Sequence, residues 1–147
     1  MYTHILIPTD GSELSRKAVR DGIALAKALG ARVTGLYAAP PATPIVYEHL
    51  LPRRYMTPQE HARLTEQAAR KYLGQIEAAA RAAGVACETV TVTSDFPSEA
   101  ILAVAKQKKC DLIVMASHGR RGLQKMLLGS ETQKVLAQAK IPVLVHR

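Results

Sequence analysis

The chain has 147 residues, of which 48% are hydrophobic and 22% charged, so it fits one ordinary globular domain and is neither disordered nor collagen-like. Lysine and arginine number 20 against 12 acidic residues, and the net charge of +8 indicates an anionic partner: a nucleotide, a nucleic acid or an anionic membrane. Aromatic residues are only 4% and tryptophan is absent, which argues against a protein that stacks single-stranded bases on aromatic rings.

The sequence carries no signal for export or membrane insertion. No apolar run approaches the roughly 18 residues of a membrane span, and the N-terminus lacks the basic and long apolar segments of a signal peptide. Cys87 and Cys110 fit neither a C-x-x-C nor a zinc-binding spacing. We therefore expect a cytoplasmic protein without a membrane partner, with two reduced, structural cysteines.

The first third of the chain reads as strand, helix, strand. A short apolar run at 5–7 ends in the turn cluster 8–12, which is typical of a buried strand followed by a loop. From 12 to 29 apolar residues recur at helical spacing, and Gly30 is suited to end that helix. The run 33–38 predicts a second strand. The helical positions that we expect to be buried are Leu14, Ala18, Val19, Ile23, Leu25, Ala26 and Leu29.

A long loop and a long helix follow. The segment 39–57 is rich in proline and predicts a loop, which we interpret as a mobile lid or a partner surface. Thr57 and Glu60 have the spacing of a capping box, with a proline between them at the first helical position. The helix should continue to about Ala83 and end at Gly84, and its expected apolar face comprises Leu64, Ala68, Leu73, Ile76 and Ala80.

The remaining elements continue the alternation. Threonines on one side of the run 85–93 indicate a partly exposed edge strand. Pro97 opens a third helix, and the apolar run 112–115 predicts a fully buried strand. After these come a glycine- and arginine-rich loop, 117–129, a short helix from 130 to about 139 and a last strand, 141–145. This order predicts a single domain, 1–147, with one parallel, doubly wound five-stranded sheet between two layers of helices.

Two strand ends carry unusual chemistry, and their positions predict the strand order. The first is the turn 8–12 after the first strand, and the second is the segment 116–119 after the fourth. Ligands of such sheets bind at the carboxyl ends of the strands, where the strand order reverses. Both segments line one site only if strands one and four are neighbours, which gives the order 3-2-1-4-5.

The loop after the fourth strand has the composition of a phosphate site. Its glycines, Gly119, Gly122 and Gly129, permit positive φ and a close approach of the backbone to a ligand. Ser130 opens a helix whose N-terminus favours anions, and Ser130 with Gln133 matches a capping box. The alternative is that the glycines only shape turns and the serine only caps the helix. Positive charge in this loop comes from Arg120, Arg121 and Lys125.

The sequence resembles the universal stress protein family over essentially its whole length. The resemblance rests on the segments 5–12, 111–119, 127–130 and 142–145. Neither a Walker A motif nor a G-x-G-x-x-G fingerprint is present. Instead, the spacing matches the G-x2-G-x9-G-[ST] motif of the ATP-binding members of this family.

One position departs from that motif, because Ala116 stands in place of the first glycine. If this residue needed a positive φ, its Cβ would cost roughly 1–2 kcal/mol, about 5- to 30-fold in affinity. It directly follows the buried strand, so we expect extended backbone there, in which alanine costs little.

The resemblance implies a Rossmann-like fold of the adenine-nucleotide alpha-hydrolase type and a bound ATP. In such a site Pro8 and Thr9 border the adenine and ribose, Asp10 hydrogen-bonds the nucleotide, and Ala38 offers its backbone to the adenine. Asp10 could also hold Mg²⁺ or Mn²⁺ through water, or serve only as a cap or turn residue before the first helix. The full implied set is Pro8, Thr9, Asp10, Ala38, Ala116, Ser117, His118, Gly119, Arg120, Arg121, Gly122, Gly129, Ser130, Glu131 and Thr132.

No catalytic residues or protein metal-ligand set stand out in the sequence. A Ser-His-Asp arrangement and paired carboxylates are both absent, and no base for ATP hydrolysis is evident. Arg120 or Arg121 could stabilise transition-state charge, so slow hydrolysis is the most that we expect.

The last strand predicts self-association. Pro142 suits the start of an edge strand, and Val143, Leu144 and Val145 leave an apolar edge with unpaired backbone groups. Antiparallel pairing of this strand with its copy would form a two-fold homodimer, as the family resemblance also implies.

The leading hypothesis is therefore an ATP-binding regulatory or stress-response factor. A second hypothesis is a family member that binds no nucleotide and acts through protein contacts. A third, prompted by the charge, is a nucleic-acid-binding module. Most basic residues fall on predicted helices and only three lie in the selected loop, which favours a triphosphate over a duplex.

Overall fold

The computed structural model describes residues 1–42, 57–120 and 127–147. Residues 43–56 of the predicted loop 39–57, and the residues Arg121, Gly122 and Lys125, lie outside the described residues. Of the ends of that loop, Ala39 belongs to the second strand and Thr57 caps the long helix. The described strands are β1 (His4–Thr9), β2 (Arg32–Ala39), β3 (Cys87–Thr93), β4 (Leu112–Ala116) and β5 (Val143–His146). The described helices are α1 (Glu13–Leu29), α3 (Pro58–Ala83), α4 (Pro97–Gln107) and α5 (Ser130–Gln138).

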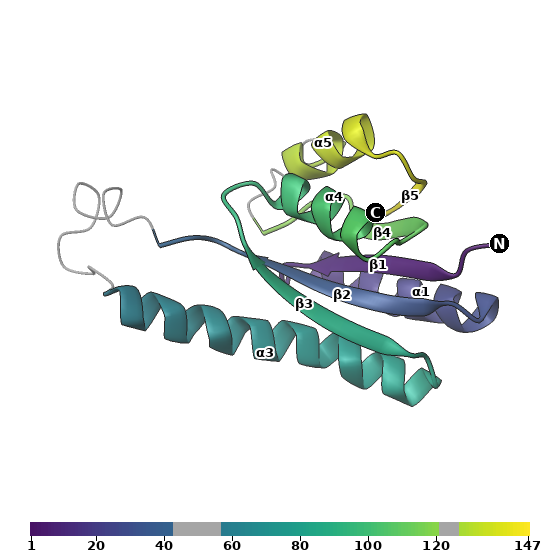
Figure 1. Cartoon of the computed structure of the whole chain (residues 1–147), viewed down its shortest axis with the longest axis horizontal. Coiled ribbons are helices and arrows are strands. Elements are labelled where there is room, and N and C mark those ends of the chain that lie inside the picture. Colours follow the sequence, from purple (N-terminus) through teal and green to yellow (C-terminus); the bar gives the residue numbers. More distant parts are fainter. Residues whose placement is uncertain (43–56, 121–126) are drawn as a thin grey trace.

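The strands form one parallel sheet in the order β3-β2-β1-β4-β5, which confirms the predicted order. Helices α4 and α5 cover one face, and α1 and α3 cover the other (Figure 1). The pairing between β1 and β2 runs along the whole of β1, from His4 to Thr9. The pairing between β1 and β4 stops after Leu6 and Ile113. The two central strands therefore separate toward their carboxyl ends, at the point where the strand order reverses.

Alternation along the strands divides the core between the two faces. Ile5 and Ile7 of β1 pack with α1 and α3, whereas Leu6 between them packs with α4 and α5. All three are completely buried. A strand buried on both faces needs a continuous apolar run, which is what this part of the sequence supplies.

Local capping chemistry fixes the ends of the two long helices. The Ser12 side chain accepts a hydrogen bond from the backbone N–H of Ser15 at the start of α1. Thr57 and Glu60 form the predicted capping box at the start of α3. Gly30 and Gly84 end these helices with φ of 66° and 72°, in the left-handed region that favours glycine. These predicted boundaries are confirmed.

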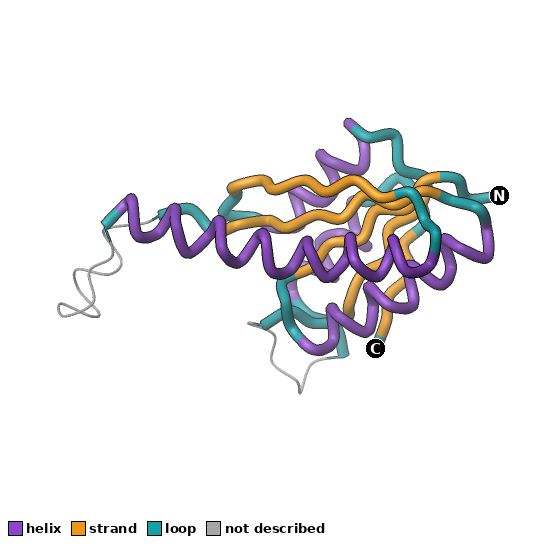
Figure 2. The backbone as a smooth tube through the Cα atoms, turned by 90° about the horizontal axis from the view of Figure 1, so that it is seen from below, coloured by secondary structure: helices purple, strands orange, loops and turns teal. Residues whose placement is uncertain are grey.

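Two leucines that were expected to be buried are exposed. Leu64 is 42% exposed and Leu29 is 38% exposed. Leu64 lies near the N-terminal end of α3, which extends beyond the end of the sheet (Figures 1 and 2). Leu29 is the last residue of α1. Helical periodicity identifies a face of the helix, but it does not show where the neighbouring sheet ends.

A polar network closes the amino end of the sheet. His4 is 2% exposed, and its Nε2 lies 2.7 Å from Thr34 Oγ1. The Thr34 hydroxyl donates to Glu88 at 3.1 Å, and Glu88 also accepts from Lys108 at 2.9 Å. Since a hydroxyl has one proton and a carboxylate only accepts, Thr34 accepts from the Nε2–H of a neutral His4. Burial, together with the charge of Arg32, lowers the pKa of His4 despite the opposing effect of Glu88.

Asp111 ties the N-terminus of the chain to the same end of the sheet. Its carboxylate accepts from the backbone N–H and hydroxyl of Thr3 and from the backbone N–H of His4, at 2.9 to 3.0 Å. Burial opposes ionisation of this carboxylate, but the hydrogen bonds outweigh it and lower its pKa.

Both cysteines are free thiols, as predicted. Burial raises the pKa of the Cys110 thiol to about 11 and also raises the pKa of Cys87. Both side chains are therefore protonated near neutral pH, the form in which a thiol is a poor nucleophile. Across the described ranges, no helix is both long and apolar enough to cross a membrane.

Candidate functional site

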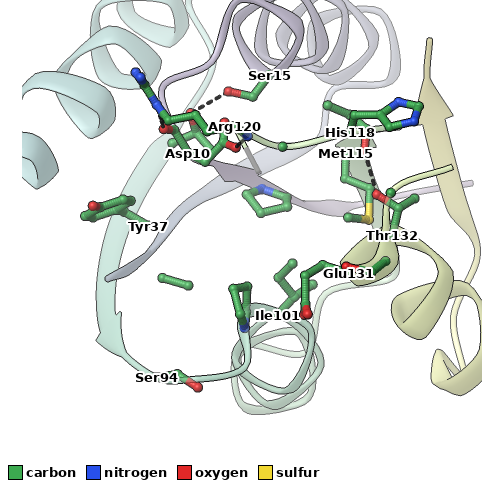
Figure 3. A pocket seen from close by; sticks show the side chains of 18 of the residues that line it. Asp10, Ser15, Tyr37, Ser94, Ile101, Met115, His118, Arg120, Glu131 and Thr132 are labelled. Carbon is green, nitrogen blue, oxygen red and sulfur yellow. Dashed lines mark hydrogen bonds between the residues drawn. The ribbon is translucent and has the colours of Figure 1, made fainter. Parts of the chain in front are cut away.

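A cavity of about 420 Å³ opens at the carboxyl ends of the strands, where β1 and β4 separate. Its walls come from the ends of β1, β2 and β4, from the segment after β3 and from the N-terminal ends of α4 and α5. Figure 3 shows Asp10 and Arg120 on one side of this space and Ile101 and Glu131 on another. The size is that of a small-molecule site, and the position is the switch point of a doubly wound sheet.

Most of the residues predicted from the sequence meet in this cavity. Ser117 does not line it, and Arg121 and Gly122 are outside the described residues. The predicted residues that line the cavity are Pro8, Thr9, Asp10, Ala38, Ala116, His118, Gly119, Arg120, Gly129, Ser130, Glu131 and Thr132.

Ser117 is buried next to the cavity but does not line it. Its hydroxyl lies 3.0 Å from Nδ1 of His118, and its carbonyl accepts from the backbone N–H of Gly129 at 2.7 Å. Its own N–H donates to His146 at the end of β5. Ser117 therefore joins the end of β4 to the start of α5, the two segments that carry the predicted motif.

The turn after β1 is held by its own side chains. Asp10 Oδ1 accepts from the backbone N–H of Ser12 at 2.9 Å, which is the Asx turn that the sequence left open as an alternative. Thr9 Oγ1 lies 3.0 Å from Ser15 Oγ and accepts from the N–H of Gly11. Hydrogen bonds within the chain thus hold this turn, and Ser12 rather than Asp10 is the cap of α1.

The glycines of the motif are needed for close contact rather than for a positive φ. Neither Gly119 nor Gly129 has a positive φ, contrary to the expectation from composition. A Cβ on Gly119 would lie 2.6 Å from Asp10 Oδ2, and one on Gly129 would lie 3.1 Å from the Ser117 carbonyl. Ala116, the departure from the motif, is the last residue of β4 and also has no positive φ, so its methyl group adds no backbone strain.

The N-terminus of α5 points at the cavity without a side-chain cap. The expected capping box between Ser130 and Gln133 does not form, because the cap residue is Gly129 and Ser130 is already helical. The Gln133 side chain donates to the Leu128 carbonyl instead. Helix geometry leaves the first N–H groups without acceptors inside the helix, and the cap residue, Gly129, has no side chain to accept from them. This end of the helix suits an anion.

Glu131, in the first turn of α5, has its charge compensated by hydrogen-bond donors from α4 and α5. Its carboxylate accepts from the backbone N–H of Ser98, near the start of α4, and from Lys134 at 3.1 Å. Burial opposes ionisation, but the hydrogen bonds from Ser98 and Lys134 prevail and lower the pKa of Glu131. The carboxylate is therefore ionised at neutral pH while its charge is compensated.

Thr132 anchors the same helix to the sheet. Its side chain is 3% exposed, and its hydroxyl donates to the carbonyl of Ala116 at 3.0 Å. Figure 3 shows this hydrogen bond beside Met115. The start of α5 is therefore fixed to the end of β4 by a buried contact.

Several lining residues were not predicted. They come from the first turn of α1, from the ends of β2, β3 and β4 with the residues that follow β2 and β3, and from α4: Ser15, Tyr37, Pro40, Pro41, Ser94, Asp95, Pro97, Ile101 and Met115. Burial and the neighbouring Tyr72 raise the pKa of Tyr37, so its phenol is neutral. The lining residues that directly follow β2 and β3 could have been predicted from the sequence, because the carboxyl ends of all strands in a parallel sheet lie at the same edge.

The fold and the cavity define a doubly wound α/β protein with a cavity at its switch point, the candidate ligand site. The model of the universal stress protein family matches residues 1–147, and the chain belongs to this family. A universal stress protein of Methanocaldococcus jannaschii is 34% identical over 145 residues, which cover 99% of this chain and 82% of that protein.

Solved structures agree with this assignment. A structure described as a hypothetical protein of M. jannaschii superimposes with a TM-score of 0.82 at 27% identity, covering 99% of this chain and 96% of that one. A universal stress protein in complex with cAMP superimposes with a TM-score of 0.69 at 26% identity, covering 99% and 97% of the two chains. The resemblance read from the sequence is therefore confirmed at the level of family and fold.

Proposed function

We propose that the protein binds an adenine nucleotide, ATP in the first instance, in the cavity between β1 and β4 and acts as a regulatory stress-response factor. The single observation that carries this proposal is the uncapped N-terminus of α5 facing the cavity. Uncapped N–H groups and the positive end of a helix dipole suit phosphate. The complex of a family relative with cAMP supports the adenine nucleotide as the ligand class.

The proposed ligand lies with its phosphates at α5 and its base at the far wall. Ser130 and Thr132 would face the phosphates, and Asp10 would accept from the ribose hydroxyls. The base would lie against the apolar surface offered by Pro97, Ile101 and Met115, near the backbone of Ala38.

A divalent ion would enter with the triphosphate rather than bind to the protein alone. Within the described ranges, no cluster of three or more His, Cys, Asp or Glu residues is arranged to hold a metal. Asp10 is one carboxylate that could reach a Mg²⁺ or Mn²⁺ held by phosphate oxygens and water.

ATP in this proposal is a ligand, and hydrolysis is slow at most. Among the described residues, three carboxylates line the cavity: Asp10 is engaged by backbone N–H groups, Glu131 is engaged by Ser98 and Lys134, and Asp95 lies in the segment after β3. Neither Asp10 nor Glu131 is a free base for an attacking water.

Nucleotide carried through purification tests this proposal directly. The protein, purified without added nucleotide, is heated and acid-extracted, and the extract is analysed for adenine nucleotides. The emptied protein is then titrated calorimetrically with ATP, with GTP as the control ligand. We expect ATP binding that GTP does not match. An extract without adenine nucleotide, together with no ATP binding, would contradict this proposal. The remaining hypothesis would be a family member that binds no nucleotide and acts through protein contacts.

We also propose a homodimer through β5. In the sheet order β5 is an edge strand that pairs with β4, and Leu144 is 42% exposed on it. Light scattering should give twice the chain mass for the parent and one chain mass for Leu144→Lys. The control, Leu29→Lys, changes an exposed leucine on α1 and should remain dimeric. A monomeric parent would exclude this assembly.

The cytoplasm is the compartment that we propose. Its reducing conditions keep thiols unpaired, and the two free cysteines support this assignment. Labelling of unfolded protein from a rapidly quenched cell extract should find both thiols reduced, whereas a disulfide would contradict it.

A further inference from the structure

Arg120 makes an unusual set of contacts for a basic residue beside a proposed phosphate site. Its Nε donates to the carbonyl of Asp10 at 2.8 Å, and its Nη2 donates to the carbonyl of Gly11 at 3.0 Å and to the hydroxyl of Tyr72 at 3.0 Å. The guanidinium also lies over the Tyr72 ring, 5.4 Å from its centroid. The side chain thus joins the loop after β4 to the turn after β1 and to α3.

The backbone of the same residue holds the Asp10 carboxylate. The N–H of Arg120 donates to Asp10 Oδ2 at 2.6 Å, while Asp10 Oδ1 accepts from Ser12. Gly119 approaches so closely that a Cβ there would meet Asp10 Oδ2. Each carboxylate oxygen therefore has one backbone donor, which fixes the direction of its remaining lone pairs.

These two sets of contacts depend on each other. The guanidinium binds two backbone carbonyls and a phenol, which are fixed acceptors on neighbouring elements. By holding them, it fixes the backbone of Arg120, whose N–H orients Asp10. An arginine fork can bind several acceptors at once, which the single ammonium of lysine does not reproduce.

We propose that Arg120 is a positioning residue that acts through Asp10, rather than a charge that contacts the phosphates. This inference rests on the proposed function, since it concerns the ribose-facing side of the same cavity. An arginine that contacts the phosphates would contribute to the affinity for ATP but not for adenosine. A positioning residue should instead contribute equally to the affinity for adenosine and for ATP.

Calorimetric titration of a small set of variants tests this role. Arg120→Ala should weaken adenosine and ATP alike, by about 5- to 30-fold, the loss expected for a group of hydrogen bonds. Arg120→Lys should behave like Arg120→Ala. The control, Arg63→Ala, changes an exposed arginine on α3 away from the cavity and should match the parent. Retained ATP affinity in Arg120→Lys, or a loss confined to ATP, would overturn the proposal.

A double-mutant cycle separates positioning from a general structural effect. In the Asp10→Asn background, Arg120→Ala should weaken adenosine binding less than 3-fold, because its partner is already impaired. Additive losses would contradict action through Asp10. Thermal unfolding of each variant reports folding independently of binding.

These experiments also distinguish failure of the proposed nucleotide binding from failure of the positioning role of Arg120. If the parent binds neither adenosine nor ATP, the nucleotide proposal fails. Amide hydrogen exchange then tests whether Arg120 positions Asp10. The Ser12 N–H donates a hydrogen bond to Asp10, and Arg120→Ala should speed exchange of this N–H at least 10-fold. Unchanged exchange in that variant would overturn the positioning role.

Discussion

The two ends of the sheet carry similar polar chemistry but use it in opposite ways. At the amino end, His4, Thr34, Glu88 and Lys108 form a chain of hydrogen bonds within the protein. At the carboxyl end, the donors of the α5 N-terminus face a cavity, and their cap residue, Gly129, supplies no side-chain acceptor. Polar groups with partners stabilise a fold, whereas polar groups held open are available to a ligand. Two polar clusters in the same sheet can therefore have different roles, one in stabilising the fold and one in binding a ligand.

The largest effect should come from closing the open end with a side chain. We expect Gly129→Val to weaken ATP binding by 100-fold or more, because even a Cβ at this position lies 3.1 Å from the Ser117 carbonyl and 3.3 Å from the His118 Cα. Calorimetry measures the affinity. Gly74→Ala is the matched control, since a Cβ there meets nothing within 4 Å. If Gly129→Val binds ATP like the parent, the phosphates do not lie at α5.

Acid should weaken the closed end in two stages. The pKa of His4 is lowered below 6.5, so the unfolded chain takes up a proton first and stability falls as the pH drops below that value. The pKa values of Glu88 and Asp111 are lowered below 4.5 and 3.8, so their contribution, present above those values, is lost at still lower pH.

Denaturant unfolding at a series of pH values measures both stages. In His4→Leu the first stage should disappear and the second should remain. His61→Gln, a change of a histidine on α3, serves as the control and should keep both stages. An unchanged first stage in His4→Leu would assign it to another group.

A smaller effect should come from removing a buried hydrogen bond between α5 and β4, at the carboxyl end of the sheet. Thr132→Val removes the hydrogen bond to the Ala116 carbonyl and should lower the free energy of unfolding by about 1–2 kcal/mol. Chemical denaturation measures it, with Thr91→Val on the exposed side of β3 as the control. Equal stability of Thr132→Val and the parent would mean that α5 is anchored by other contacts.

The smallest effect concerns the turn before β4, at the amino end of the sheet. Lys109 has a φ of 57°, in the region that disfavours residues with a Cβ. Lys109→Gly should raise the free energy of unfolding by less than about 1 kcal/mol, because relief of strain is partly offset by a more flexible unfolded chain. A clear loss of stability would show that the lysine side chain contributes contacts of its own.

The sequence was most informative where structure depends on local chemistry. The caps at Thr57, Gly30 and Gly84 involve residues a few positions apart, and their predicted roles are confirmed. Strand order was also predictable, because two unusual strand ends had to meet at one site. Both of these inferences use spacing along the chain, which the sequence displays directly.

The predictions that were wrong, and the features that were missed, depend on contacts between segments far apart in the sequence. The N–H of Gly129 is held by the Ser117 carbonyl, and the helix that follows starts with Gly129 as its cap, so the capping box expected at Ser130 does not form. The network of His4, Thr34 and Glu88 unites three strands and has no motif in any of them. Exposure of Leu64 follows from the length of the sheet, which helical periodicity does not encode.

Glu131 gives the cavity a direction. Two helices, α4 and α5, begin at its wall, and each N-terminus alone would attract an anion. The Glu131 carboxylate supplies the anion for α4 by accepting from Ser98, so that helix is already neutralised from within the chain. For the proposed nucleotide, the α4 end is then less attractive to phosphate than the α5 end. This asymmetry favours the proposed orientation, in which the phosphates of an elongated ligand lie at α5.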